Sequence, residues 1–244
     1  MNGFARLCGA AAAVICAAVV AWAPAGAQGL EVAPTNIQLA PGQSAVALTI
    51  TNRNERKVSF QIRGFSWGQQ GAEEDVLTPT DAILASPPIA TIEPGATQVV
   101  RLVLKHPPEG HEETYRILFD QLPPPDEAGV VHLLIRISIP VFAEPSTRVS
   151  PRVHWRIAQQ GGHSWLVATN DGTRHLTVHD IGLQSADGRA LGVEIKSPPH
   201  ILAGASRRWP ILTKDPLAPN EVVRLTAGAD SGAIDERVSP DSSP

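Results

Sequence analysis

The sequence predicts an all-β fold, and three features of the chain support that prediction. Apolar and polar residues alternate over many short stretches, as in 45–51, where Val46, Leu48 and Ile50 fall on one face. Gly and Pro are abundant, at 20 and 22 of 244 residues, and they separate these stretches with turn sequences. No window keeps the i, i+3, i+4 apolar spacing of an amphipathic helix. We therefore expect antiparallel strands that each bury one face.

The first 27 residues have the layout of a secretory signal peptide rather than of a fold element. Arg6 is an early cation, an apolar run follows from about Leu7 to Trp22, and 25–27 supplies the small residues of a cleavage site. The alternative is an uncleaved membrane anchor, for which the run is short at its ends. We expect residues 1–27 to be removed and the rest to be exported, with no membrane insertion after cleavage.

Composition narrows the classes of function. Both cysteines and the only methionine lie inside the expected signal peptide, so disulfide scaffolds, cysteine-based zinc sites and cysteine nucleophiles are excluded. The formal net charge is −4 and no basic run occurs, whereas nucleic-acid binding needs clustered Lys and Arg. The sequence contains no nucleophile elbow and no phosphate-cradling Gly loop. We expect neither enzymatic activity, nor a cofactor, nor a nucleic-acid partner.

Two groups of histidines could in principle supply metal ligands. His175 and His179 share a face of an expected strand, but residues four apart on a strand are about 13 Å apart, too far to share one ion. His106 and His111 flank a turn with the acidic pair 112–113, where a solvated loop is favoured over a weak surface site. We expect no metal site.

The predicted strands divide into two groups. An immunoglobulin-like β-sandwich takes about 100 residues, so two such domains in series fit the length. A stretch with two prolines and small polar residues, 142–151, follows the last strand of the first group. We expect an N-terminal domain over 28–146 and a C-terminal β-sandwich over 147–228. Residues 229–244 are polar and carry Ser, Asp and Pro, so we expect a disordered tail.

The longest alternating stretch is 131–141, in which every odd position is Val, Leu or Ile. Pro140 lacks an N–H, which places the strand at a sheet edge rather than in the middle. Two interpretations remain open at this point. The stretch is either an ordinary core strand or an edge strand whose apolar side chains are offered to another chain by strand addition.

Eight short segments run in order over nearly all of the first expected domain: 32–39, 48–52, 86–89, 92–95, 98–102, 115–116, 122–124 and 139–142. In these segments the chain resembles the periplasmic chaperones of the chaperone–usher pathway of pilus assembly, which are built from two immunoglobulin-like domains. The combination of Ile139–Phe142 with Phe65–Trp67 resembles the branch that serves archaic pili and spore-coat-protein-U-like subunits.

The resemblance implies a periplasmic chaperone that donates its edge strand to incomplete pilus or fimbrial subunits and delivers them to an outer-membrane usher. The side chains that would enter successive pockets of the subunit are Val131, Leu133, Ile135 and Ile137. Release by strand exchange would need no nucleotide. The alternative function is a structural fibre subunit or adhesin built from the same kind of domain, against which the two domains and the long internal strand argue.

One departure from the family concerns the two basic residues that anchor the subunit's terminal carboxylate. Asn36 and Pro140 occupy those positions here, and Asn36 can offer a hydrogen bond but no charge. Arg116 is the first candidate for the anchor and Arg101 the second, because strand alternation points Arg136 away from the donated face. Each of these arginines can instead be an ordinary surface cation. The Arg of the family's interdomain ion pair is also replaced, by Glu144.

Overall fold

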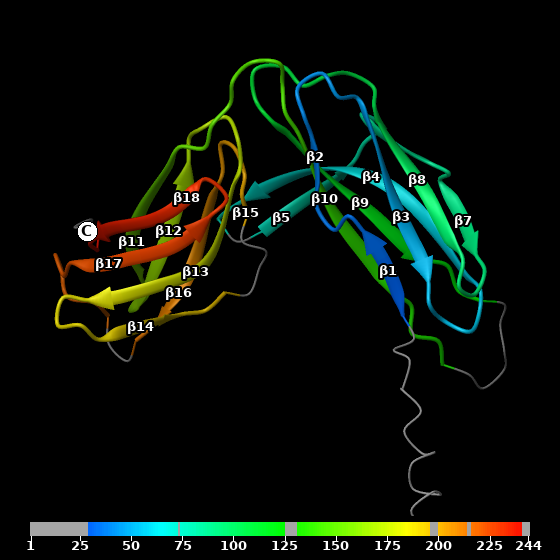
Figure 1. Cartoon of the computed structure of the whole chain (residues 1–244). Helices are drawn as coiled ribbons and strands as arrows, with labels where there is room; N and C mark the ends of the chain where they lie inside the picture. The colour runs from blue at the N-terminus through cyan, green and yellow to red at the C-terminus, as the bar shows by residue number, and fades with distance from the viewer. Residues whose placement is uncertain (1–28, 73, 125–130, 196–199, 214–215, 241–244) are drawn as a thin grey trace, which may run out of the picture.

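The computed structural model describes residues 29–72, 74–124, 131–195, 200–213 and 216–240. Every helix or strand assigned within these ranges is a β-strand. No strand pairing in this described part joins the first ten strands to the last eight, and Figure 1 shows the two groups as separate lobes. The all-β prediction and the expectation of two domains in series are confirmed. The expected signal peptide lies outside the described residues.

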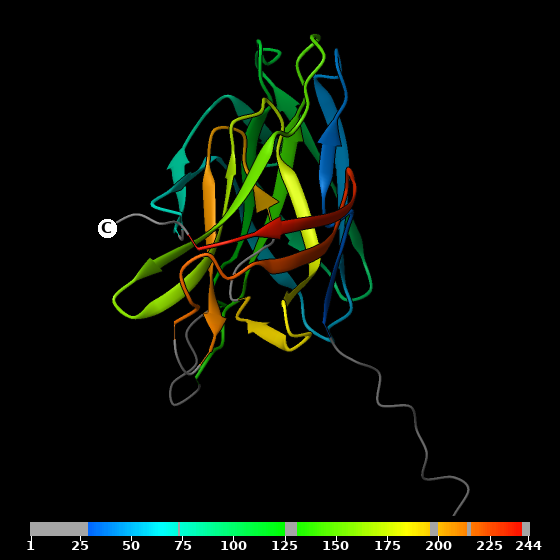
Figure 2. The ribbon, with the colours of Figure 1, turned by 90° about the vertical axis from the view of Figure 1, so that its left-hand side faces the viewer.

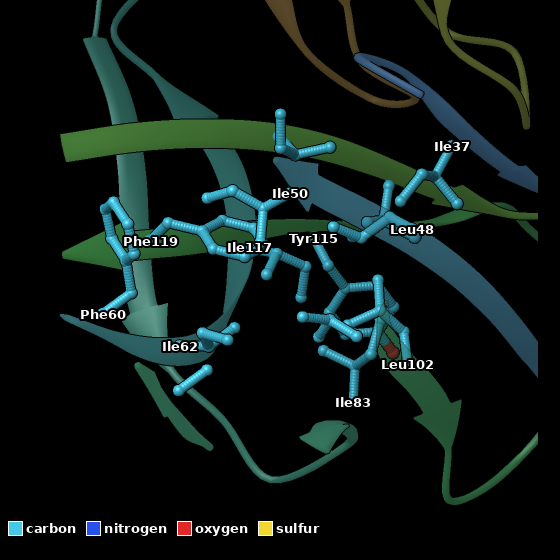
Figure 3. Close-up of a cluster of buried hydrophobic side chains, with 14 of the residues drawn as sticks. Ile37, Leu48, Ile50, Phe60, Ile62, Ile83, Leu102, Tyr115, Ile117 and Phe119 are labelled. Atoms are coloured by element: carbon cyan, nitrogen blue, oxygen red, sulfur yellow. The ribbon is translucent and has the colours of Figure 1, made fainter. Parts of the chain in front are cut away.

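The first domain packs two sheets against each other. Its strands are β1 Leu30–Ala33, β2 Ile37–Leu39, β3 Ala45–Asn52, β4 Val58–Gln70, β5 Glu74–Pro79, β6 Ile83–Ser86, β7 Ile89–Ile92, β8 Thr97–Leu104, β9 Glu113–Gln121 and β10 Arg136–Ala143. One sheet has the order β1-β3-β8-β6, and the other has the order β2-β10-β9-β4-β5 with β7 also paired to β4. Alternate apolar residues meet between the sheets, where Phe60 and Phe119 pack edge to face (Figure 3).

Strand β10 begins later than the sequence predicts. The alternation starts at Val131, but the strand starts at Arg136. The neighbouring strand explains the difference, because β9 ends at Gln121 and a diproline follows at 123–124, where no N–H is available. The last ladder bond runs from the Gln121 N–H to the Ile135 carbonyl oxygen, at 3.1 Å. Among the described residues, no strand therefore lies beside 131–135 to pair with them.

The outer edge strand at the opposite end of the same sheet is β5. Strand β5 pairs with β4 and ends in Pro79, opposite Phe65. The Thr80 N–H bonds to the Gly64 carbonyl, so the odd-numbered residues of β5 turn their backbone groups outward. Pro79 is one of them and has no N–H to offer, so this outer edge is short of donors.

The second domain contains β11 Val153–Gln160, β12 His163–Asn170, β13 Leu176–Ser185, β14 Ala190–Val193, β15 His200–Ile201, β16 Ser206–Leu212, β17 Val223–Ala229 and β18 Gly232–Val238. The sheet order is β11-β12-β16-β14-β13-β17-β18, with β15 beside β13. A bridge between Ile157 and Pro240 brings the two ends of this order together. Apolar side chains fill the space inside, including Trp209, which stacks on Trp155 with ring centroids 5.9 Å apart.

The expectation of a disordered tail over 229–244 is wrong for its greater part. Residues 232–238 form β18, which pairs with β17 along its whole length, and Figure 2 shows the two strands side by side. Val238 is buried in the core and Ile234 packs against it. An ion pair between Arg224 and Asp235 joins the strands on the exposed face. The second domain therefore extends beyond residue 228, while residues 241–244 lie outside the described part.

Candidate functional site

Strand β10 leaves most of one edge open. It lies between β9 and β2, but β2 pairs only with Val141–Ala143, in parallel, beginning with Ile37 opposite Val141. Along Arg136–Pro140, no strand of the described part pairs on that side. An uncovered strand edge can accept another strand, because its outward backbone groups are unpaired.

The alternation of hydrogen bonds shows which backbone groups face this open edge. The bond from Gln121 to the Ile135 carbonyl assigns the odd-numbered positions to β9, since bonded and non-bonded pairs alternate in an antiparallel ladder. On the other side, the Glu144 N–H bonds to the Leu39 carbonyl of β2, as the even-numbered positions require. Ser138 therefore points its N–H and carbonyl outward. Pro140 offers only a carbonyl, at the level where β2 begins.

The apolar face of this segment leaves the core and continues into solvent. Ile139 and Val141 are buried, and Ile137 is partly buried against the core of the first domain. Ile135 is 43% exposed. The two residues before it on the same face are almost fully exposed, Leu133 at 90% and Val131 at 89%. Beside them a hollow of about 550 Å³ opens toward Leu30 and the start of β4.

Arg116 lies one strand in from the open edge, at the level where the edge is closed by β2. It stands on β9 opposite Pro140 in the strand register and is buried. Its guanidinium carbon sits 3.7 Å from the centre of the Trp67 ring, a cation–π contact. Its Nη2 is 3.9 Å from Asp75 Oδ2. Burial lowers the pKa of Arg116, the charge of Asp75 opposes that shift and the charge of Arg207 adds to it.

The other two anchor candidates occupy different places. Asn36 is exposed and immediately precedes β2. Because Ile37 lies opposite Val141, Asn36 lies at the level of Pro140, at the same end of the edge as Arg116. Arg101 lies on β8 in the other sheet of the sandwich and is exposed, away from this group. Arg136 bonds to Asp120 on the face opposite the apolar one, as strand alternation predicts. The structure brings Asn36 and Arg116 to one end of β10 and leaves Arg101 apart.

An aromatic cluster between the domains was not predicted. Phe142 lies on the face of β10 opposite the core and stacks on His175 of the second domain, with ring centroids 3.6 Å apart. Trp67 lies 5.8 Å from Phe142, and His200 meets the Trp67 ring edge to face at 5.6 Å. Leu202 and Ala205 from the second domain complete the apolar contact with Trp67 and Phe142. The one signal in the sequence is an aromatic residue on the non-core face of the strand.

A buried polar contact lies next to this cluster and corrects the expectation of a solvated loop at 112–113. Glu112 is buried, and one of its carboxylate oxygens is 2.6 Å from Nδ1 of His175 and 2.9 Å from the His175 N–H. Arg174, the next residue along, is 3.1 Å from Glu144. Glu144 thus takes part in an interdomain ion pair, in which Arg174 of the second domain supplies the positive charge.

The buried position of His200 predicts a pH dependence. Burial, together with the smaller effects of the charges of His175, Arg116 and Arg207, lowers the pKa of His200 to about 4, and the charge of Asp75 opposes this shift. An unfolded histidine takes up a proton near pH 6.5. Between these two pH values the unfolded chain binds more protons than the folded chain does. The free energy of unfolding therefore falls as the pH falls. Between pH 7 and pH 5 we expect His200 to account for a loss of about 2 kcal/mol in the free energy of unfolding.

Urea unfolding of the wild type and His200→Gln at pH 7 and pH 5 measures this effect. The variant lacks the titrating group, so its loss of stability on acidification is expected to be smaller by about 2 kcal/mol. His163→Gln, on an exposed position, is the matched control and is expected to follow the wild type. Parallel losses in all three proteins would show that His200 is not the group responsible.

The fold and part of the sequence have known counterparts. Residues 29–148 match the family described as pili and flagellar-assembly chaperone, PapD N-terminal domain. No curated protein matches the chain. Within the described residues no helix is long and apolar enough to cross a membrane, and no three His, Cys, Asp or Glu side chains are placed to hold one metal ion.

Solved structures of similar fold cover nearly the whole chain. A chain of the CsuC–CsuE chaperone–tip adhesion subunit complex from archaic Csu pili of Acinetobacter baumannii aligns with a TM-score of 0.63 and 21% identity, over 87% of this chain and 99% of that one. The E. coli chaperone DraB aligns with a TM-score of 0.56 and 18% identity, over 88% and 96%. A chain of the Salmonella enterica SafA pilin in complex with the SafB chaperone aligns with a TM-score of 0.57 and 13% identity, over 86% of this chain and 95% of that one. At these identities the likeness establishes a common fold.

Proposed function

Through residues 29–148 the chain belongs to the family of pili and flagellar-assembly chaperones, and on that premise we propose how it holds a pilus subunit. It binds the subunit by donating the segment 131–138 as the strand that the subunit's own sandwich lacks. Val131, Leu133, Ile135 and Ile137 enter the open core of the subunit. The terminal carboxylate of the subunit binds at Arg116, and the complex is delivered in the periplasm to an outer-membrane usher.

The observation that carries this proposal is the open edge of β10 together with the apolar face that extends from it into solvent. A protein that kept such a segment without a partner would expose an aggregation site. Burial of one aliphatic side chain contributes about 1.5–3 kcal/mol, so four contribute about 6–12 kcal/mol before the costs of association are subtracted. On this proposal, residues 131–135 become a strand when the subunit pairs with them.

Arg116 suits the anchoring role by its place in the sheet. Strand β2 runs parallel to β10 and begins opposite Val141. A subunit strand that lies along the open edge in the same direction would end at Pro140, where β2 takes over the edge. Arg116 lies across β10 from that point, and Asn36 lies beside it. A guanidinium there can donate charge-assisted hydrogen bonds to a terminal carboxylate. We do not assign this role to Arg101, which lies in the other sheet.

The proposal makes the chain a binding protein without catalytic residues, cofactor or metal. Its partners are pilus or fimbrial subunits, among them subunits like spore-coat protein U, and the usher. The solved structures of similar fold include complexes of a chaperone with a tip adhesion subunit and with a pilin. The alternative of a structural fibre subunit is not favoured by the family match or by these neighbours.

Co-expression with a pilus subunit and purification of the chain from the periplasm tests the proposal. A complex of one chain with one subunit is expected, and the subunit alone is expected to be lost to aggregation or proteolysis. Polymers that contain this chain at every position would instead identify it as a fibre component. Subunit that accumulates equally well with and without the chain would contradict a chaperone role.

A further inference from the structure

Asp75 lies between two arginines that come from different domains. It stands on β5, opposite Gln69 in the ladder with β4. One carboxylate oxygen binds Arg207 of β16, which is fully buried. The other oxygen is 3.9 Å from Nη2 of Arg116. In the described part of the chain, Asp75 is the one carboxylate within ion-pair distance of Arg116.

We propose that Asp75 is a placeholder for the subunit's carboxylate, and that Arg207 determines how firmly it holds Arg116. This inference rests on the proposed function of Arg116 as the anchor. As long as Arg207 keeps Asp75 bonded to itself, the contact between Asp75 and Arg116 stays long and weak. An incoming carboxylate can then replace it. Arg207 is a positioning residue, because it acts on the bound subunit only through Asp75.

The two contacts of Asp75 differ in strength in the direction that this role requires. The contact with Arg207 is a direct hydrogen bond between a guanidinium and a carboxylate, whereas 3.9 Å to Arg116 is beyond hydrogen-bonding distance. Arg207 also donates to the His200 carbonyl oxygen at 3.3 Å, which holds its guanidinium in place. Gln69 is 3.4 Å from the same Asp75 oxygen that Arg207 binds. Asp75 is thus drawn toward the second domain.

Arg116 in turn is kept in position without a strong ion pair. The Trp67 ring supports its guanidinium from one side at 3.7 Å. Arg116 is buried, and a buried positive charge is unfavourable unless a negative charge lies close to it. A terminal carboxylate that arrives along the open edge of β10 supplies that partner. Before the subunit binds, Asp75 supplies part of this negative charge. The subunit's carboxylate displaces it on binding.

The inference predicts that removing Arg207 weakens subunit binding although Arg207 does not touch the subunit. In Arg207→Met, Asp75 loses its stronger partner and turns to Arg116, where it competes with the incoming carboxylate. In the double variant Asp75→Asn/Arg207→Met the competitor is gone as well, and binding returns. Replacing both partners of a buried ion pair together is tolerated far better than replacing one, so the double variant keeps the fold measurable.

The probe is a synthetic nonapeptide of alternating valine and threonine, made once with a free carboxylate and once as the amide. For the wild type we expect tighter binding of the acid than of the amide. Arg207→Met is expected to bind the acid about tenfold more weakly and the amide unchanged, and the double variant is expected to recover wild-type affinity for the acid or exceed it. Arg224→Met, which removes an exposed arginine bonded to Asp235, is the control and is expected to leave both affinities unchanged.

Circular dichroism of each variant accompanies the titrations. Equal loss of acid binding in Arg207→Met and in the double variant would overturn the placeholder role, because it would mean that Arg207 acts only through the fold. The variant Arg116→Gln separates this result from failure of the proposed anchor. If Arg116→Gln keeps the preference for the acid, the carboxylate binds elsewhere and the anchor itself is wrong.

Discussion

Replacing Leu133 and Ile135 together by glutamate is expected to abolish the hold of this chaperone on its pilus subunit while its own fold stays intact. Both side chains lie outside β10, and Leu133 is 90% exposed, so neither contributes to the core of the first domain. In the complex each glutamate would be buried without a partner in the subunit's groove, which costs several kcal/mol per charge. Co-expression with a pilus subunit measures the effect as loss of the subunit from the periplasm.

The matched control is Leu134→Glu. Leu134 is 48% exposed and lies between the two substituted residues, and the alternation of the sequence assigns it to the opposite face of a strand formed by this segment. We expect this variant to retain most of the subunit, since the new charge stays in water. If the double variant stays folded by circular dichroism and the complex survives, the segment is not the donated strand. Equal losses in the control and the double variant would show that charge, rather than the apolar face, is responsible.

Phe142→Ala is expected to lower the protein's free energy of unfolding by a large amount. The ring is fully buried and contacts Trp67 of the first domain and both His175 and His200 of the second. Removing a buried phenylalanine ring typically costs about 3–5 kcal/mol, because the cavity that remains collapses only in part. Since the ring joins the two domains, we also expect their unfolding to separate into two transitions. Urea unfolding followed by tryptophan fluorescence, with scanning calorimetry, tests both expectations.

Leu84→Ala is the control for this experiment. Leu84 is on the first domain's β6 and is nearly half exposed, so its truncation is expected to cost well under 1 kcal/mol and to leave the unfolding transition unchanged in shape. If Phe142→Ala costs no more than Leu84→Ala, the aromatic cluster does not hold the domains together. The expected separation into two transitions would be contradicted by a single cooperative transition at lower urea concentration.

The fold class and the apolar face of residues 131–141 could be predicted because both follow from local alternation of apolar and polar residues. Leu48 and Ile50 are buried as their spacing predicts, and so are Ile139 and Val141. The starting point of β10 could not be predicted in the same way. It depends on where the neighbouring strand β9 ends, and no pattern within 131–141 records that. The alternation shows which face of the segment is apolar. Whether that face is exposed depends on the end of β9, which the alternation does not record.

Contacts between distant side chains account for the remaining differences. Glu112 and His175 are 63 residues apart, and nothing in the acidic turn around Glu112 indicates that a histidine from the second domain will cover it. Strand β18 was missed for a different reason. Glu236 falls between Ile234 and Val238 in the alternation and is exposed, so the apolar alternation of β18 is weak and its composition is that of a tail. Pairing with β17, rather than burial along its length, makes it a strand.

The open edge of β10 also limits how many chains can join this sheet. At the other end of the same sheet, Pro79 removes a donor from the outer edge of β5. On the near side, β2 and Pro140 bound the open stretch, so one added strand fills it. The missing donor makes the far edge of this sheet a poorer template for a further strand. The geometry of the sheet therefore sets a one-to-one stoichiometry between this chain and a strand that pairs along the open edge of β10.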